Sequence, residues 1–397
     1  MGERRNRALG AVLVAEVVSM TGTEMTAVAL PWFVLVTTGS PARMAGVMSA
    51  EFVGTAFLGI PSGRLAHALG PRRTMLIADA GRAPLLGLVP LLYAVGGLSY
   101  AVLLAVGFAV GACFPAYSSS QRLVVASVVG DDEVALTRIG GVLGAVNETA
   151  SFVGPALGGA LVAVIGASAV LAVDAVTYVV SFAILALAIP RQPRPPDEEG
   201  AGDLLAGLRW LWRDSAIRRQ ILAVMVAELG WTALMAALPV AARHRYDGGA
   251  ALAGWFVGAY GGGSIIGGLI SARTKRIGMR TATLAMVVIA ALSWVMVPRV
   301  PAWAVIACVA GTGVCNQIYF PRLFAALTVA PPVALRTQVM TAAMTAASVT
   351  GPIGFVVAGL LIDGRPVTGA FVVVAVAASV AATISVWPRS DPVASTR

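Results

Sequence analysis

AVLVAEVVSMTGTEMTAVAL, residues 11–30, is a run of mainly apolar side chains that two glutamates interrupt. A helix of this length rises by about 1.5 Å per residue and spans about 30 Å, which is the thickness of the hydrocarbon core of a bilayer. Similar runs recur along all 397 residues, of which 58% are hydrophobic and only 12% are charged. Soluble domains carry about 25% charged residues. The chain is therefore predicted to be an all-α polytopic membrane protein.

The apolar runs predict twelve transmembrane helices in two bundles of six. The predicted ranges are 9–36, 43–63, 74–96, 99–121, 137–164, 167–189, 217–241, 249–272, 280–298, 302–325, 334–362 and 367–387. Most basic residues between these ranges lie on the side of the N-terminus, which the positive-inside rule identifies as the cytoplasm. The basic residues on the opposite side are Arg43, Arg243, Arg245, Arg299 and Arg365. Both termini are thus predicted to be cytoplasmic.

The composition also bears on the membrane and the partners. Lys275 is the only lysine and glycine is abundant, with 44 residues, which favours a GC-rich bacterial genome and a bacterial cytoplasmic membrane. The net charge of +9 does not indicate nucleic-acid binding, because the basic residues are not gathered in one patch. The expected partners are the lipid bilayer, protons and a small amphipathic or lipophilic substrate, and the protein is expected to be a monomer.

The segment RQPRPPDEEGAGD, residues 191–203, lies halfway along the chain and is rich in proline and acidic residues. It is predicted to be a flexible cytoplasmic connector. The residues that follow, LLAGLRWLWRDSAIRR, predict an amphipathic helix on the membrane surface. The predicted domains are an N-terminal bundle at 1–190, this linker with its helix at 191–216, and a C-terminal bundle at 217–397. No connection is long enough for a soluble catalytic domain, so an enzyme is not expected.

Two motifs occur once in each half of the chain. GPALGG begins at Gly154, and GPIGFVVAG begins at Gly351 in the equivalent helix. GRLAHALGPRR at 63–73 and GGLISARTKRIGMR at 267–280 form the second pair. Such repeats indicate two bundles that rock about a site at their interface. The glycines and prolines of the first pair either allow a helix to slide or bend, or serve ordinary small-residue packing. They are Gly154, Pro155, Gly158, Gly159, Gly351 and Pro352.

Part of the first basic segment resembles the loop signature of the major facilitator superfamily. The matching residues are Gly63, Leu65, Gly70, Arg72 and Arg73. His67 stands where that family has an aspartate that helps to lock the outward-facing state, so this lock is expected to be weaker or pH-dependent. GPALGG is similar to the helix-five signature of the family's antiporters. The stretches FPAYSSSQRLVVASVV and AVNETASFVGPALGG resemble the third drug–proton antiporter branch.

This resemblance implies the major facilitator fold and a secondary active transporter that works by alternating access. It implies proton-coupled export of amphipathic small molecules, such as a drug, an antibiotic or a siderophore. The proton gradient would supply the energy, and no cofactor is expected. A lysophospholipid flippase and a nutrient importer stay open as alternatives. A membrane receptor without transport activity is a further alternative, which the lack of a signalling domain in the sequence disfavours.

Five carboxylates lie inside apolar runs: Glu16, Glu24, Glu51, Glu148 and Glu228. An ionised carboxylate at the centre of a bilayer costs at least about 2.5 kcal/mol. Such a residue faces a wet cavity, pairs with a partner or stays protonated. A carboxyl group of this kind can load a proton on one side and release it on the other, or bind a cationic substrate when it is ionised.

Not all five glutamates are expected to act alike. Glu16 and Glu24 are eight residues apart and share one face of their helix, and this helix commonly lines the cavity in the superfamily. Together with Glu148 and its neighbour Asn147, they are the preferred proton-coupling candidates. For Glu51 and Glu228 a structural role is an equal alternative.

Other polar and aromatic residues complete the predicted site. Trp231, Asn316 and Gln317 are predicted to contact substrate, because amides are disfavoured in lipid and an aromatic ring can stack on a lipophilic ligand. Asp79 and Arg82, three residues apart, are predicted to form an ion pair that braces the gate region. Asp174 is predicted to be a structural hydrogen-bond partner. The cysteines are predicted to be small buried hydrophobes, since they lack metal-ligand spacing, and no metal site is expected.

Overall fold

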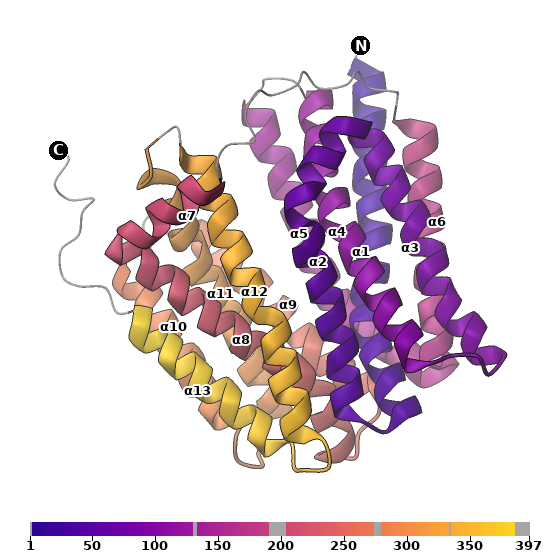
Figure 1. Ribbon diagram of the computed structural model, residues 1–397, viewed down its shortest axis with the longest axis vertical. Coiled ribbons are helices and arrows are strands. Elements are labelled where there is room, and N and C mark those ends of the chain that lie inside the picture. The colour runs from indigo at the N-terminus through magenta and orange to yellow at the C-terminus, as the bar shows by residue number, and fades with distance from the viewer. Residues whose placement is uncertain (1, 130–132, 190–203, 274–278, 333–334, 386–397) are drawn as a thin grey trace.

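The computed structural model describes residues 2–129, 133–189, 204–273, 279–332 and 335–385, and all regular structure in these ranges is helical (Figure 1). The helices are α1 (Gly2–Thr38), α2 (Pro41–Leu69), α3 (Pro71–Ala94), α4 (Tyr100–Val129), α5 (Glu133–Ile165), α6 (Ala167–Ala188), α7 (Leu204–Arg213), α8 (Ser215–His244), α9 (Ala250–Arg273), α10 (Met279–Val295), α11 (Ala302–Val329), α12 (Arg336–Ile362) and α13 (Thr368–Ser385). Within the described residues, ten helices are long and apolar enough to cross a membrane. The predicted all-α membrane fold is confirmed.

The predicted loop between the second and third spans is shorter than the sequence indicated. The helix α2 continues through Leu69, and α3 begins at Pro71, so Gly70 alone separates the two helices. Gly70 has a φ of 83°, a left-handed conformation that glycine adopts without steric cost, and proline is preorganised for the first position of a helix. Gly63, Leu65 and His67 therefore lie in the helix rather than in a loop, and their side chains lie outside the described residues.

The helices gather in two groups, α1–α6 and α7–α13, whose internal pairings repeat (Figure 1). The pairs α1 with α5, α2 with α4 and α3 with α6 in the first group correspond to α8 with α12, α9 with α11 and α10 with α13 in the second. This correspondence agrees with the repeated motifs of the sequence. The predicted boundary at residues 190–203 lies outside the described residues, so the exact domain limits stay a prediction.

The two groups contact each other mainly through α5 with α9 and α2 with α12. We call the end at which α1 begins the inner end and the opposite end the outer end. Near the outer end, a Cβ atom on Gly159 of α5 would lie 3.0 Å from the Cα atom of Gly254 of α9. Toward the inner end of α5, a Cβ atom on Gly140, Gly141 or Gly144 would have no neighbouring atom within 4 Å. The structure is therefore closed between the groups at its outer end, whereas these three glycines of α5 face open space toward the inner end.

The amphipathic helix predicted after the linker is present as α7. Leu211 is buried against α8 and α12, whereas Trp212 is half exposed. The helix ends at Arg213 because Asp214 begins the next helix, where its Oδ1 atom accepts a 3.0 Å hydrogen bond from the backbone N–H of Ile217.

Candidate functional site

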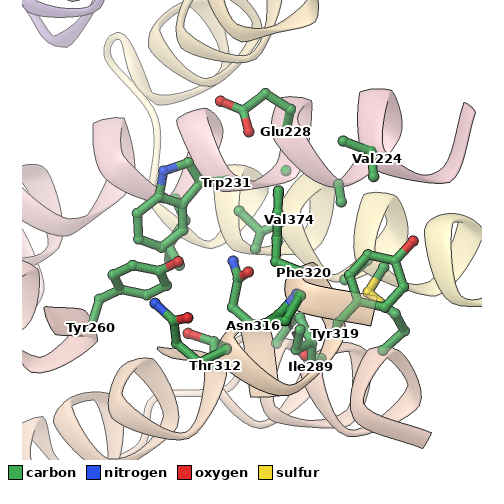
Figure 2. A pocket seen from close by; sticks show the side chains of 18 residues that line it. Val224, Glu228, Trp231, Tyr260, Ile289, Thr312, Asn316, Tyr319, Phe320 and Val374 are labelled. Atoms are coloured by element: carbon green, nitrogen blue, oxygen red, sulfur yellow. Dashed lines mark hydrogen bonds between the residues drawn. The ribbon is translucent and has the colours of Figure 1, made fainter. Parts of the chain in front are cut away.

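A cavity of about 460 Å³ lies within the second group of helices, between α8, α9, α10, α11 and α13. Aromatic rings form much of its wall, and Trp231 and Tyr260 lie side by side with ring centroids 4.1 Å apart (Figure 2). The other large rings are those of Tyr319 and Phe320, which belong to α11. An apolar aromatic wall of this kind suits a flat, lipophilic molecule.

Four of the predicted site residues line this cavity: Glu228, Trp231, Asn316 and Gln317. Thr312, Asn316 and Phe320 follow one another at intervals of four along α11, so a single helix face presents all three side chains to the cavity. Glu228 lies at the edge of the group in Figure 2, and its carboxyl group makes no hydrogen bond or ion pair with another described residue. The amide of Asn316 also has no hydrogen-bond partner among the described residues.

One hydrogen bond links this cavity to an acid of the first group. Gln317 of α11 donates from Nε2 to Oε1 of Glu148 on α5, at 2.7 Å, and both side chains are half-buried. The backbone carbonyl of Gln317 accepts a 2.8 Å hydrogen bond from Ser271 Oγ of α9, which holds this part of α11 in place. The buried Oδ1 atom of Asn147, next to Glu148, has no partner among the described residues. Gln317 thus contacts Glu148 and forms part of the cavity wall.

The two glutamates of α1 are held by different helices. Glu16 is 3% exposed and accepts a hydrogen bond from Nε2 of Gln121 on α4. Glu24 is half-buried and accepts a 2.9 Å hydrogen bond from Oγ of Ser151 on α5. Neither glutamate lines the cavity of the second group. Gln121 and Ser151 are absent from the residues predicted above, although a polar side chain inside an apolar run is the signal that could have found them.

Glu51 lies on α2 opposite Gly111 of α4. A Cβ atom on Gly111 would overlap the backbone of Glu51, so the glycine is what allows the two helices to approach. The carboxyl group of Glu51 has no hydrogen-bond partner among the described residues. It lies close enough to Glu24 and Asp174 for the charges to interact, which places it among the acids of the first group.

The predicted ion pair between Asp79 and Arg82 is confirmed, with 2.5 Å between Oδ1 and the guanidinium. Both side chains are buried, and Ser181 Oγ donates to the second carboxylate oxygen of Asp79 at 2.7 Å. The Arg82 guanidinium lies 4.6 Å and 4.4 Å from the ring centroids of Tyr117 and Tyr178. This arrangement pairs the two charges inside the first group, while the buried Nε atom of Arg82 has no hydrogen-bond partner among the described residues. Its part in gating stays a prediction.

Asp174 has the structural role that the sequence predicted. Its carboxylate accepts hydrogen bonds from Thr26 Oγ1 at 2.6 Å and from Thr177 Oγ1 at 2.8 Å. Arg72, from the family signature, lies at the C-terminal end of α6, where it donates to the carbonyls of Ile189 and Ala186 at 2.7 Å. A cation in this position caps the helix end. Arg73 is exposed.

The repeated glycine and proline motifs lie at helix junctions. A Cβ atom on Gly154 or Gly158 would meet α1, at Glu24 and Met25 respectively, while Gly159 faces α9. In the second half, Gly351 faces Phe52 of α2, and the Pro352 carbonyl accepts a 3.3 Å hydrogen bond from Ser49 Oγ. The motifs therefore provide close helix packing at and near the contact between the groups. Whether they also move during transport stays a prediction.

The described residues contain neither a group of metal ligands nor a disulfide. No three His, Cys, Asp or Glu side chains are grouped there as metal ligands. Cys308 and Cys315 are buried and Cys113 is partly buried, and all three are free thiols.

Comparison with known proteins gives the family. The model of the family described as "Transmembrane secretion effector" matches residues 4–394. The chain belongs to this family of major facilitator transporters. Its members' transport role agrees with the fold, so the chain is a multi-pass membrane transporter of the major facilitator type.

Named relatives and solved structures agree with this assignment. The multidrug efflux pump Tap of Mycobacterium tuberculosis is 28% identical over 382 residues, which cover 92% of this chain and 89% of the pump. Tap of Mycolicibacterium fortuitum is 28% identical over 389 residues, covering 91% and 90%. The nucleoside transporter NupG shares the fold, with a TM-score of 0.77 at 12% identity over 95% of this chain and 98% of that one. A bacterial homologue of the iron transporter ferroportin, in its inward-facing state, gives a TM-score of 0.73 at 15% identity over 96% and 98%.

Proposed function

We propose that this major facilitator transporter exports amphipathic small molecules in exchange for protons. The observation that carries the proposal is the hydrogen bond between Gln317 and Glu148. It joins an ionisable group in one group of helices to the wall of an aromatic cavity in the other. Alternating access requires a contact between the groups whose strength changes with the ligands bound.

Protonation of Glu148 would change this contact in a definite direction. A hydrogen bond to an ionised carboxylate is roughly twice as strong as one between neutral groups. When Glu148 takes up a proton, the bond from Gln317 weakens and α11 is released from α5. When Glu148 loses the proton, the bond reforms. Proton movement is thereby coupled to the separation of the two groups of helices.

The acids of α1 would receive and pass on protons within the first group. Glu16 and Glu24 each accept one side-chain hydrogen bond from a neutral partner, Gln121 and Ser151 respectively, and have no basic partner within ion-pair distance among the described residues. A carboxyl group in such surroundings can exist in both protonation states without leaving an unpaired cation behind. Asp79 differs, because it forms a buried ion pair with Arg82.

The substrate would bind in the aromatic cavity. Trp231 and Tyr260 offer ring faces, while Asn316 and Thr312 offer polar contacts that fix its orientation. The names of the Tap relatives, as multidrug efflux pumps, support export of such molecules. We propose that both termini face the cytoplasm, in line with the distribution of basic residues.

Transport of ethidium by the purified protein in proteoliposomes tests the proposal. A pH gradient across the membrane should drive ethidium movement, and a protonophore should abolish it. Glu148→Gln should still bind ethidium but should lose the response to the gradient, because the amide cannot ionise. Equal ethidium movement with and without the gradient would rule out proton coupling. Movement of a headgroup-labelled lysophospholipid without any movement of ethidium would favour the flippase alternative.

A further inference from the structure

A second cavity, of about 560 Å³, lies at the outer end and is lined by basic side chains. They are His244 at the end of α8, Arg245 directly after it, Arg299 between α10 and α11, and Arg365 between α12 and α13. Gly39 and Pro41 close the cavity from the first group of helices. None of the described lining residues carries a carboxylate. The cavity therefore concentrates positive charge where the two groups meet.

Hydrogen bonds hold the guanidinium of Arg245 in place, but they do not neutralise its charge. Arg245 is 7% exposed, and its guanidinium donates to the backbone carbonyls of Met296 at 3.0 Å, Val297 at 3.3 Å and Pro298. Arg299 in turn donates to the carbonyl of Arg245 at 2.9 Å. Carbonyl groups orient a guanidinium, but they carry no net charge. Among the described residues, no carboxylate lies within ion-pair distance of any basic side chain in this cavity.

The acids near the cavity do not remove this imbalance. Asp363 is exposed and does not line the cavity, although its neighbours Ile362 and Gly364 do, and its Oδ1 atom accepts a 3.0 Å hydrogen bond from Ser40 Oγ. Asp247 is also exposed, on the connection between α8 and α9, and does not line the cavity. Three arginines and a histidine thus face a space that an anion can enter.

The backbone leaves room for that anion. Gly39 from the first group and Gly364 from the second have φ values of 66° and 67°, and a Cβ atom on either would have open space around it. The cavity also gathers Arg245, Arg299 and Arg365, three of the arginines that depart from the positive-inside rule. Arginines retained on the outer side need a reason other than topology.

We propose that this cavity binds a phosphate group. A guanidinium donates two parallel N–H bonds to phosphate oxygens, and Arg299 and Arg365 are exposed enough to do so while Arg245 adds a fixed charge below them. The cavity lies where α8 and α12 end, and we place this end of the helices at the phospholipid headgroups. The phosphate belongs either to an anionic lipid of the outer leaflet or to a soluble phosphate outside the cell.

The position of the cavity gives the bound phosphate an effect on conformation. Its walls come from both groups of helices, so they stay together only while the outer end is closed. A ligand that binds one conformation more tightly shifts the population toward it. Phosphate bound here stabilises the state with a closed outer end.

Binding to the full-length protein in detergent tests the proposal. Native mass spectrometry compares phosphatidylglycerol with the diacylglycerol of the same acyl chains, which lacks the phosphate. A thermal-shift titration compares inorganic phosphate with chloride at equal ionic strength. Retention of phosphatidylglycerol but not diacylglycerol assigns a lipid headgroup, whereas a shift with inorganic phosphate alone assigns a soluble ligand. No preference in either comparison overturns the proposal.

Matched variants locate the site. The pair Arg299→Gln with Arg365→Gln should weaken binding at least tenfold. The control pair Arg43→Gln with Arg243→Gln removes the same charge from the outer end but not from the cavity lining, and should change binding less than twofold. Equal weakening by both pairs would show a general surface-charge effect and overturn the proposal. If the first pair unfolds at a lower temperature, Arg299→Lys keeps the charge and should bind with intermediate strength.

Discussion

At the scale of single residues, the charged side chains inside the membrane helices differ in whether they have a partner. Asp79 and Arg82 satisfy each other, and Ser181, Tyr117 and Tyr178 complete their surroundings. Glu228, by contrast, has no partner among the described residues although it lines a largely apolar cavity. A charged residue without a partner in a membrane protein is expected to serve a ligand or a proton, and one in an ion pair to serve the fold.

Asp79→Asn should therefore destabilise the protein strongly. Removal of one partner leaves the Arg82 charge buried and uncompensated, which costs about 3–5 kcal/mol. Asp363→Asn makes the same chemical change at an exposed carboxylate that has one hydrogen bond, and should cost less than about 1 kcal/mol. Thermal unfolding in detergent measures both variants. Equal shifts in unfolding temperature would show that the buried pair is not a determinant of stability.

Trp231→Ala should weaken substrate binding in the aromatic cavity. The loss of one stacking ring removes about 0.5–1.5 kcal/mol, which corresponds to a rise in the dissociation constant of about two- to twelve-fold. Trp303→Ala is the matched control, because this tryptophan is 70% exposed and does not line the cavity. Equilibrium binding of ethidium, followed by fluorescence polarisation, distinguishes the two. A similar loss in both variants would place the binding site elsewhere.

At the scale of helices, α5 has two functions along its length. Its outer half carries Gly154, Gly158 and Gly159, which bring the backbone against α1 and α9. Its inner half carries Gly140, Gly141 and Gly144, which touch nothing at their Cβ positions. Glu148 lies between the two halves and contacts Gln317. The glycines of α5 thus change from close contacts to open space at the level of Glu148, while Ile139 and Leu143 of the inner half still pack against the first group.

This difference predicts opposite effects for the same substitution. Gly154→Ala places a methyl group against the side chain of Glu24 and should destabilise the protein by about 1–3 kcal/mol. Gly144→Ala meets no neighbour and should stabilise the helix by about 0.4–1 kcal/mol. Thermal unfolding and ethidium transport of both variants provide the measurement. If Gly144→Ala proves as harmful as Gly154→Ala, the inner half of α5 must pack against another helix in a second state.

The sequence predicted the helices well and their junctions less well. Apolar length predicted the ten described helices that are long and apolar enough to cross a membrane, because a span must satisfy its backbone hydrogen bonds internally. The end of α2 was placed too early, since Gly63 looked like a helix end while the turn depends on Gly70. The helix α7 was predictable because apolar residues recur at helical spacing in LLAGLRWLWR and because Trp210 and Trp212 suit a membrane interface. The residue at which one helix ends and the next begins depends on the φ value of a single residue such as Gly70. The length of an apolar run does not reveal that value.

At the scale of the whole molecule, the two groups of helices are joined at the outer end. The rings of Phe52 and Phe355 lie 5.1 Å apart across α2 and α12. Ser40 and Asp363 add a hydrogen bond of 3.0 Å between the connections at the outer end. This arrangement requires the outer contacts to break before the substrate can leave on that side.

A cross-link at this position should stop transport. Ser40→Cys with Asp363→Cys places two thiols where the native side chains already touch, so mild oxidation should join them. Ethidium transport should then fall to the level of protein-free liposomes and return after reduction with dithiothreitol. Each single cysteine variant is the control, since Cys308 and Cys315 are buried and Cys113 partly so. Undiminished transport by the cross-linked protein would show that the outer end need not open.

The sequence predicts several individual residues of the candidate site, but it does not predict which of them contact one another. Polar residues in apolar runs identified Glu148 and Gln317 separately, because each is costly in lipid. Their contact joins α5 to α11, and no spacing within a sequence gives the distance between two such helices. The same holds for Glu16 with Gln121. The cavity within the second group was also not predicted, because side-chain packing between five helices decides its volume.

Gln317 both bonds to Glu148 and lines the aromatic cavity, and this affects how the range of substrates can evolve. A substitution at this position alters the cavity and the bond to Glu148 together, so selection for a new substrate there also disturbs turnover. Asn316 lines the same cavity without bonding to Glu148, and can vary with less effect on coupling. Among closely related transporters, we expect divergence in substrate preference to accumulate at position 316 before position 317.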